Sequence, residues 1–379
     1  MHREVNILLL DAYELSAMIK NQEISCRRVM ATYLEHIEKT NPLVNAIISL
    51  RDKETLMREA DEKDEALLRG EYQGWMHGFP FAVKDLALTK GITTTLGSAA
   101  LADHIPDKDS LIVERIKSQG AIIIGKTNTP EFGLGSQTYN NVFGATASAW
   151  NHELTAGGSS GGTASALAMF MLPVADGSDM MGSLRNPAAF NSIYGFRPSQ
   201  GRVPLSETTE LYFNQMATEG PMGRSVQDVA LLLSTLAGRD DRSPLSLGGN
   251  GAEFTASLES DCRRKKVGWL GDLNGYLPFE EGVLPLCQGA LSVLASTGCH
   301  ITNATLNADL PAVWQAWCQL RQASVAHALL PLYSDPKKKA LLKPEAIWEI
   351  ENGQSLSAGQ LMQAAATRTA FYRAILALF

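Results

Sequence analysis

Residues 157–187 read GGSSGGTASALAMFMLPVADGSDMMGSLRNP, and two features separate this stretch from ordinary sequence. The first is Gly157-Gly158-Ser159-Ser160-Gly161-Gly162, which stands immediately before an apolar helical run. Glycines let backbone amides approach a ligand closely, and a helix N-terminus adds unpaired N–H donors. A flexible linker is the alternative, although linkers seldom lead directly into an apolar helix. A phosphate loop is disfavoured because no lysine follows at the Walker position.

The second feature is a turn of small residues from Asp176 to Pro187, which follows a strand-like run and surrounds Ser183. Consecutive amides in such a turn can point at one oxygen and form an oxyanion hole beside a serine nucleophile. A nucleophilic serine needs a base, and histidine is the usual one. His77 and His152 lie near relevant segments, but neither belongs to a recognisable triad motif. We expect both histidines to be structural or on the surface.

Lysine is the other side chain that can serve as the base, provided that it is neutral. The reference pKa of lysine is about 10.4, and complete burial can lower it by about 3–5 units. Lys84 ends a run in which Phe81 and Val83 indicate a buried strand, and Asp85 is expected to face the opposite side. Taken alone, this segment favours an ordinary surface lysine beside an aspartate.

Helix-like and strand-like stretches alternate on both sides of this segment. Residues 11–39 read as two helices, the second with Ser25 as its N-cap and a stop at Asn41-Pro42. The order of a helix followed by an apolar strand occurs at 110–125, 163–175 and 283–302. This order predicts an α/β protein with one large domain, in which helices cover both faces of a mixed, mostly parallel twisted sheet.

Composition narrows the class of protein. The 379 residues are 45% hydrophobic and 19% charged, which fits a soluble globular chain, and the net charge is −7. Because lysines and arginines are scattered among acidic residues, we expect neither nucleic acid nor an anionic membrane as a partner. The N-terminus lacks the long apolar segment of a signal peptide, and the longest apolar stretch is too short to span a bilayer.

The five cysteines are far apart and never have a CxxC or Cys/His ligand spacing; they are Cys26, Cys262, Cys287, Cys299 and Cys318. This spacing favours reduced thiols over a disulfide framework or a zinc site. We therefore expect a cytoplasmic protein.

Three segments together resemble the amidase signature family. Its pattern joins a strand ending in Val-Lys-Asp, a GGSSGG loop, and a Gly-Ser/Thr-Asp-x-Gly-Gly-Ser-x-Arg-x-Pro-Ala turn. In this chain Lys84 ends the strand, and Ser159 and Ser183 stand 24 residues apart, as the pattern requires. Supporting matches are found at residues 126–132, 194–199 and 220–228. The resemblance runs from about residue 11 to the end of the chain.

The resemblance implies the amidase signature fold and an amidase that cleaves the C–N bond of a linear carboxamide. It implies that Ser183 is the nucleophile, that Lys84 is the base, and that Ser159 relays a proton between them. An acyl-enzyme forms and is hydrolysed to a carboxylate, with release of ammonia or an amine. The implied partner is a small-molecule amide, without metal or cofactor, and a homodimer is one option for the oligomeric state.

The residues around the nucleophile receive supporting roles from the same resemblance. The backbone N–H groups of Met180, Met181, Gly182 and Ser183 would form the oxyanion hole. Three further side chains support the loop or contact the substrate: Ser160, Asp179 and Arg185.

Two departures from the family pattern matter. The family usually has Gly-Gly before the nucleophile, whereas this chain has Met181-Gly182. A methionine with positive φ costs about 1–2 kcal/mol and can turn an oxyanion donor away; with negative φ, Met181 merely narrows the pocket. Relatives also continue beyond a helix like the one that ends this chain, so we expect a C-terminal truncation.

The sequence leaves three functions open. The first is a free-standing amidase, the second is the amidase subunit of a tRNA-dependent amidotransferase, and the third is a truncated, non-catalytic member of the family. Within a single domain at 1–379 we expect a helical N-terminal region at 1–70, a catalytic core at 71–238, a loop or insertion at 239–262, and an incomplete C-terminal part at 263–379.

Overall fold

The computed structural model describes residues 5–208, 210–213, 215–256, 258, 259 and 261–379. The chain divides into two compact units, which are described separately. The first contains Met1–Leu258 and Leu332–Ala346, and the second contains Glu259–Pro331 and Ile347–Phe379. The first unit carries all the residues singled out as a candidate site.

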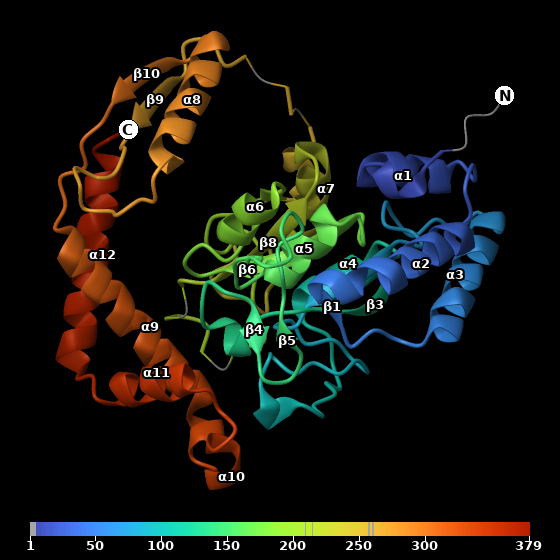
Figure 1. Ribbon diagram of the computed structural model, residues 1–379, viewed down its shortest axis with the longest axis horizontal. Helices are drawn as coiled ribbons and strands as arrows, with labels where there is room; N and C mark the ends of the chain where they lie inside the picture. The colour runs from blue at the N-terminus through green and yellow to red at the C-terminus, as the bar shows by residue number, and fades with distance from the viewer. Residues whose placement is uncertain (1–4, 209, 214, 257, 260) are drawn as a thin grey trace. The chain divides into compact units, whose positions relative to one another are not determined.

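Helices begin the first unit. After a short 3-10 turn, η1 (Ile7–Leu9), come α1 (Ala12–Lys20), α2 (Cys26–Val44) and α3 (Lys53–Leu68). Figure 1 shows α2 and α3 side by side along one flank of this unit. Ser25 caps α2 by accepting a hydrogen bond from the Arg28 N–H, as predicted.

The predicted stop of α2 at Asn41-Pro42 is wrong. The helix continues through Pro42 to Val44 and ends at Asn45, which has a left-handed conformation with φ of 52°. A proline removes one hydrogen bond and crowds the preceding turn, but so near the end of a helix few bonds remain to be lost. The side chain of Asn41 then binds the chain that leaves the helix, accepting from the N–H groups of Ala46 and Ile47.

Two three-stranded sheets form the centre of the first unit. One has the order β1 (Ile47–Ile48), β3 (Ile122–Thr127) and β2 (Pro80–Lys84); the other has the order β6 (Val174–Asp179), β8 (Thr218–Gly223) and β7 (Tyr194–Gly195). The side chain of Asp176 on β6 accepts a hydrogen bond from the Lys84 N–H on β2, which links the two sheets. The largest buried side chains of the core include Tyr33, Phe79 and Phe81.

The strands are mixed in direction, as predicted, but the parallel share is smaller than expected. β2 pairs with β3 in parallel, whereas β1 with β3, β6 with β8, and β7 with β8 are antiparallel. The difference arises from β8, whose sequence, Thr-Glu-Gly-Pro-Met-Gly, lacks the apolar run of a recognisable strand. A short hairpin of β4 (Tyr139–Asn140) and β5 (Gly144–Ala145) adds a further antiparallel pair.

Further helices pack around these strands. They are η2 (Ala99–Leu101), α4 (Leu111–Ser118), η3 (Glu131–Gly133), α5 (Gly161–Ala168), α6 (Arg185–Asn191), α7 (Val226–Leu236) and η4 (Gly251–Phe254). α5 packs against α6 and β6, and α7 packs against β8 and α4. Asp228 of α7 accepts hydrogen bonds from the first two N–H groups of α1, both at 3.0 Å, and so fastens the N-terminal helices to the central sheets.

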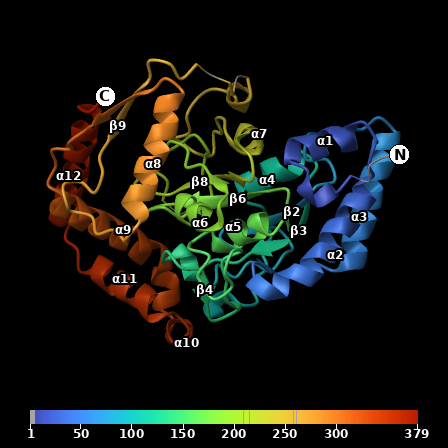
Figure 2. The ribbon, with the colours of Figure 1, turned by 45° about the horizontal axis from the view of Figure 1, so that its top comes forward.

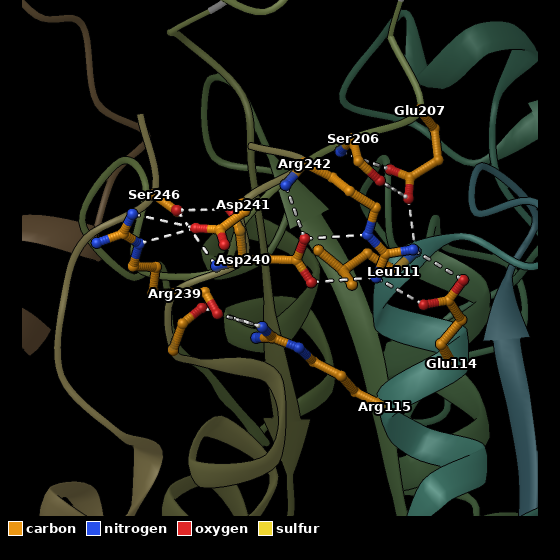
Figure 3. A network of polar contacts seen from close by, with 11 residues as sticks. Leu111, Glu114, Arg115, Ser206, Glu207, Arg239, Asp240, Asp241, Arg242 and Ser246 are labelled. Carbon is orange, nitrogen blue, oxygen red and sulfur yellow. Dashed lines mark hydrogen bonds and ion pairs between the residues drawn. The ribbon is translucent and has the colours of Figure 1, made fainter. Parts of the chain in front are cut away.

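The first part of the predicted loop at 239–262 is fixed by ion pairs (Figure 3). The Arg242 guanidinium binds the Glu114 carboxylate at 2.8 Å and Asp240 at 3.0 Å. Arg115, one residue further along α4, donates to the carbonyl oxygens of Leu236 and Gly238 at the end of α7. These contacts hold the chain after α7 against α4.

The second unit has its own small α/β core. β9 (Lys266–Trp269) and β10 (His300–Asn303) pair in parallel, and α8 (Val283–Ser296) connects them, as the helix-then-strand pattern at 283–302 predicted. The helices that follow along the chain are α9 (Leu310–Tyr333), α10 (Pro336–Lys339), α11 (Pro344–Gln354) and α12 (Ala358–Leu376), drawn in orange to red in Figure 2. The short α10 belongs to the first unit. α9 and α11 approach closely at Gly353, where a Cβ atom would stand 2.2 Å from the Gln322 carbonyl oxygen.

Two other findings concern the described residues. None of the helices there has the length and apolarity that crossing a membrane would require. All five cysteines lie in the described part of the chain, and no disulfide joins any of them.

Candidate active site

Lys84 lies at the end of β2 and is only 1% exposed. Its ammonium nitrogen, Nζ, lies 2.7 Å from the Ser159 hydroxyl oxygen, 2.8 Å from that of Ser160 and 3.0 Å from that of Ser178. The alternative of a surface lysine beside an aspartate is therefore wrong. The fold brings together the end of β2, the glycine loop before α5 and strand β6, and so forms one cluster of amine and hydroxyl groups.

Burial changes the protonation of this lysine. Removal from water lowers the pKa of Lys84 from 10.5 to about 7, and the nearby acids Asp176, Asp179 and Glu219 oppose this shift only in part. A lysine with a pKa near 7 is substantially neutral at neutral pH, so its nitrogen has a lone pair that can accept a proton.

The glycine loop is rigid rather than a flexible linker. Gly161 and Gly162 begin α5, and a Cβ atom on either would come within 2.3 Å of a neighbouring atom, the Thr138 hydroxyl oxygen or the Asn128 backbone nitrogen. The Gly158–Ser159 peptide bond is cis. Ser159 and Ser160 are both buried, at 2% and 0% exposure. Glycine is needed here because other parts of the first unit pack directly against the loop backbone.

The loop that carries Ser183 is organised by Asp179, the last residue of β6. Its carboxylate accepts from the Gly182 N–H at 2.7 Å and from the Leu184 N–H at 3.1 Å. It also binds the Arg185 guanidinium, with an Nε to Oδ2 distance of 3.0 Å. These hydrogen bonds hold the pKa of Asp179 below its usual value despite burial, so the carboxylate stays ionised. In the structure Asp179 and Arg185 thus support the loop.

Ser183 is half-buried, and its carbonyl oxygen accepts from the Ser160 N–H at 3.2 Å. This backbone contact joins the loop to the lysine cluster. Within the described ranges the Ser183 hydroxyl makes no hydrogen bond to Lys84 or Ser159. The structure therefore brings Lys84 and Ser159 into contact and fastens Ser183 to the adjacent Ser160.

The backbone of the turn decides between the two readings of Met181. Met181 is absent from the residues with positive φ, whereas Gly182 has φ of 111°. The position that demands glycine is therefore occupied by glycine, and the methionine side chain is 51% exposed beside the loop. The alternative with a positive φ at Met181 is therefore wrong, and the narrowing of a pocket by its side chain stays a prediction.

One of the predicted oxyanion donors is not available. The Gly182 N–H donates to Asp179, because the left-handed turn directs it toward that buried carboxylate. In the described part of the chain, the N–H groups of Met180, Met181 and Ser183 have no protein acceptor. The donors that could stabilise a negative oxygen are therefore these three.

Three polar residues of this region were not predicted from the sequence: the buried Asp176 and the half-buried Ser178 and Glu219. The turn was expected to start at Asp176, but β6 continues to Asp179, so Asp176 and Ser178 follow the period of two of a strand. That alternation was visible in the quoted stretch. Glu219 lies on β8, directly opposite Ser178, and nothing in its local sequence pointed to the site.

The other candidate groups have structural roles. His77 is buried, accepts from the Gln73 N–H at 3.2 Å and stacks on the ring of Tyr72, which agrees with the expected structural histidine. A second buried lysine, Lys126, donates to the Ala87 carbonyl oxygen and the Thr89 hydroxyl, and so fixes the chain that leaves Lys84. No cluster of three or more His, Cys, Asp or Glu side chains suited to a metal ion occurs among the residues described.

In this cluster the group that contacts the serine hydroxyls is the amine of a lysine. The Amidase family model matches residues 28–379. The chain is 34% identical over 302 residues to an acylamidase of Rhodococcus erythropolis, covering 80% of this chain and 63% of that protein. It is 36% identical over 299 residues to one of the subunits of the glutamyl-tRNA(Gln) amidotransferase of Saccharolobus solfataricus, covering 78% of this chain and 60% of that protein.

A solved crystal structure also matches this chain. A bacterial aryl acylamidase of the amidase signature enzymes superposes with a TM-score of 0.92 at 29% identity, covering 98% of this chain and 77% of that one. The chain belongs to the amidase signature family. It spans about three fifths of the length of the curated relatives that it matches, 63% and 60% in the two cases above.

Proposed function

We propose that this chain is an amidase that hydrolyses a linear carboxamide to a carboxylate and ammonia or an amine. The observation that carries the proposal is the buried contact of 2.7 Å between Lys84 Nζ and the Ser159 hydroxyl, together with a lysine pKa of about 7. A neutral lysine beside a serine hydroxyl is the arrangement that activates a serine without histidine.

In the proposed reaction, Lys84 takes the proton of Ser159 while Ser159 takes the proton of Ser183. The Ser183 oxygen attacks the amide carbon, and the negative charge that develops on the carbonyl oxygen is stabilised by the N–H groups of Met180, Met181 and Ser183. The proton then passes back from Lys84 through Ser159 to the leaving nitrogen, and the C–N bond breaks. Water attacks the acyl-enzyme with the same proton path and releases the carboxylate.

The remaining polar side chains have supporting roles in this proposal. Ser160 and Ser178 accept hydrogen bonds from Lys84 and hold its nitrogen beside Ser159. Asp179 and Arg185 keep the Ser183 loop in its turn. Catalysis depends on such fixed positions, because a misplacement of about 1 Å can cost a factor of about 10² in rate.

The substrate class follows from the relatives as a proposal. Two are named acylamidase and aryl acylamidase, so an anilide or other small aryl or alkyl amide is the first substrate to test. A cytoplasmic location is part of the proposal and rests on cysteine spacing alone.

The test is turnover of an amide panel by the purified chain and by Ser183→Ala. We expect the variant to lose about 10⁴-fold or more in kcat, as loss of a serine nucleophile does in other hydrolases. Ser118→Ala, an exposed serine at the end of α4, is the matched control and should keep full activity. Equal turnover by Ser183→Ala and the wild type would remove the proposal.

The amidotransferase subunit is a second candidate, because a relative of that kind is 36% identical. It requires glutaminase activity that appears only when partner subunits are added. The non-catalytic alternative requires that a fluorophosphonate probe fails to label Ser183 both in the wild type and in Met181→Gly. Labelling of Ser183 in the wild-type chain would exclude that alternative.

A further inference from the structure

Glu219 is a half-buried acid with a buried carboxyl oxygen, and the proposed reaction has no use for it. It lies on β8 directly opposite Ser178 of β6, in an antiparallel pair. Residues that face each other across such a pair project from the same face of the sheet, with Cβ atoms about 4.5–5.5 Å apart. Because the Ser178 hydroxyl reaches Lys84, the Glu219 side chain also lies on the lysine side of the sheet.

The hydrogens of the cluster can be counted. A neutral lysine has two N–H donors and one lone pair, and three hydroxyl oxygens surround its nitrogen. For the lone pair to accept the proton of Ser159, both N–H groups must be directed at Ser160 and Ser178. Those two hydroxyls must therefore act as acceptors toward Lys84, and each must donate its own O–H hydrogen bond to another atom.

Ser160 meets this condition within the structure. Its hydroxyl donates to the Ser178 carbonyl oxygen at 3.3 Å, and its oxygen accepts from the Ser178 N–H at 3.3 Å. Its orientation toward Lys84 is fixed by these contacts. Ser178 has no such partner: across the described residues, its hydroxyl makes no hydrogen bond other than that from Lys84.

Glu219 offers the acceptor that Ser178 lacks. Its oxygen Oε2 is buried and has no hydrogen-bond partner in the part of the chain that the structure describes. Buried polar atoms seldom stay unpaired, because each costs about 1–3 kcal/mol. A donor without an acceptor and an acceptor without a donor thus face each other across β6 and β8.

Resting on the function proposed above, we propose that Glu219 is a positioning residue, which accepts a hydrogen bond from the Ser178 hydroxyl and so turns the lone pair of Lys84 toward Ser159. The charges around Glu219 are those of Lys84 on β2, Lys126 on β3, Asp176 on β6 and Glu207 in the loop before β8. Burial, aided by the two acids, raises the pKa of Glu219 well above its usual value. A protonated carboxyl group keeps an acceptor oxygen for Ser178 while carrying no negative charge that would favour the ammonium form of Lys84.

The test is the rate at which a fluorophosphonate probe labels Ser183, measured by intact mass across pH 5–10. Glu219→Met keeps the length of the side chain but offers no oxygen acceptor, and labelling should slow by about 10- to 100-fold. Glu219→Gln retains an acceptor oxygen and should restore most of the rate. Glu153→Met, at an exposed glutamate of the same unit, is the control and should label like the wild type.

The pathway through Ser178 is tested by a double-mutant cycle. If Glu219 acts through that hydroxyl, Ser178→Ala combined with Glu219→Met labels no more slowly than Ser178→Ala alone. Additive losses would overturn the pathway, and wild-type labelling by Glu219→Met would overturn the role of Glu219. Should Glu219→Met fail to fold, Glu219→Gln and Ser178→Ala test the positioning role of Glu219 instead. Slow labelling by both variants overturns this role. Slow labelling by Ser178→Ala alone supports it. Failure to label the wild-type chain would instead remove the proposed function itself.

Discussion

Replacing Lys84 by methionine should change the pH dependence of stability in a way that reports the burial of this amine. Lys84→Met keeps the length of the side chain and removes the group that titrates. In the folded protein the pKa of Lys84 is lowered to about 7, whereas an unfolded chain has the ordinary value near 10.5. Between these values the unfolded state holds one more proton than the folded state, so the free energy of unfolding of the wild type rises with pH.

The structure sets the size of the effect. Lowering the pKa of Lys84 from 10.5 to about 7 corresponds to a free-energy cost of roughly 5 kcal/mol for burying the charged form, at 1.36 kcal/mol per pKa unit. This cost of burying the ammonium is fully present below pH 7 and is relieved as pH rises from 7 toward 10. Methionine avoids the cost but gives up three hydrogen bonds, each worth about 1 kcal/mol. At pH 6 we expect Lys84→Met to be more stable than the wild type by about 2 kcal/mol.

The assay is urea unfolding followed by circular dichroism at pH 6, 7, 8 and 9. The stability advantage of the variant should fall by about 1.4 kcal/mol per pH unit above pH 7, so that the wild type becomes the more stable protein between about pH 8 and pH 9. Other groups titrate in both chains and largely cancel in this difference. Parallel stability curves for the two proteins across this range would refute the reasoning, because they would mean that Lys84 keeps an ordinary pKa.

Three other changes test the geometry of the loop and of the fold. Gly182→Ala places a Cβ atom at a φ of 111°. We expect a loss of about 1–2 kcal/mol in the free energy of unfolding in urea and slower fluorophosphonate labelling of Ser183. Unchanged labelling would contradict the left-handed turn at Gly182. Met181→Gly removes a side chain that is 51% exposed beside the nucleophile; KM for bulky anilides should fall with kcat almost unchanged, and equal KM values would show that Met181 does not narrow the pocket. Asp228→Ala leaves the first two N–H groups of α1 without acceptors and should cost about 1–2 kcal/mol of stability; a loss below about 0.3 kcal/mol would mean that α1 is held mainly by other contacts.

The sequence motifs predicted that Lys84 and Ser159 would lie together, but they did not predict every hydrogen-bond partner of Lys84. Lys84 and Ser159 are 75 positions apart, yet their contact of 2.7 Å was expected from the family pattern. Ser178 was missed because the turn was assumed to begin two residues before it, and in a turn the alternation of a strand does not apply. Glu219 could not have been found, since its proximity arises from the antiparallel register of β6 and β8, and register is a tertiary property.

Helix ends and the donors of the Ser183 loop were likewise predictable only in part. Ser25 was recognisable as a cap because the capping hydrogen bond is local, within three residues. The continuation of α2 through Pro42 to Val44 was not recognised, because Asn41-Pro42 was taken as a stop and the hydrogen bonds of the Asn41 side chain to Ala46 and Ile47 follow only after the helix end. The occupied N–H of Gly182 likewise follows from the position of Asp179, which the sequence assigned only to general support of the loop.

The rate of Ser183 labelling by a fluorophosphonate as a function of pH bears most directly on whether a neutral, buried lysine activates one hydroxyl through another. If Lys84 is that base, the rate rises tenfold per pH unit and levels off near pH 7, in line with a lysine pKa of about 7, and Ser159→Ala and Lys84→Met abolish the rise. A rate that keeps climbing to about pH 10, the ordinary range of lysine, or that persists in Lys84→Met, would contradict the account.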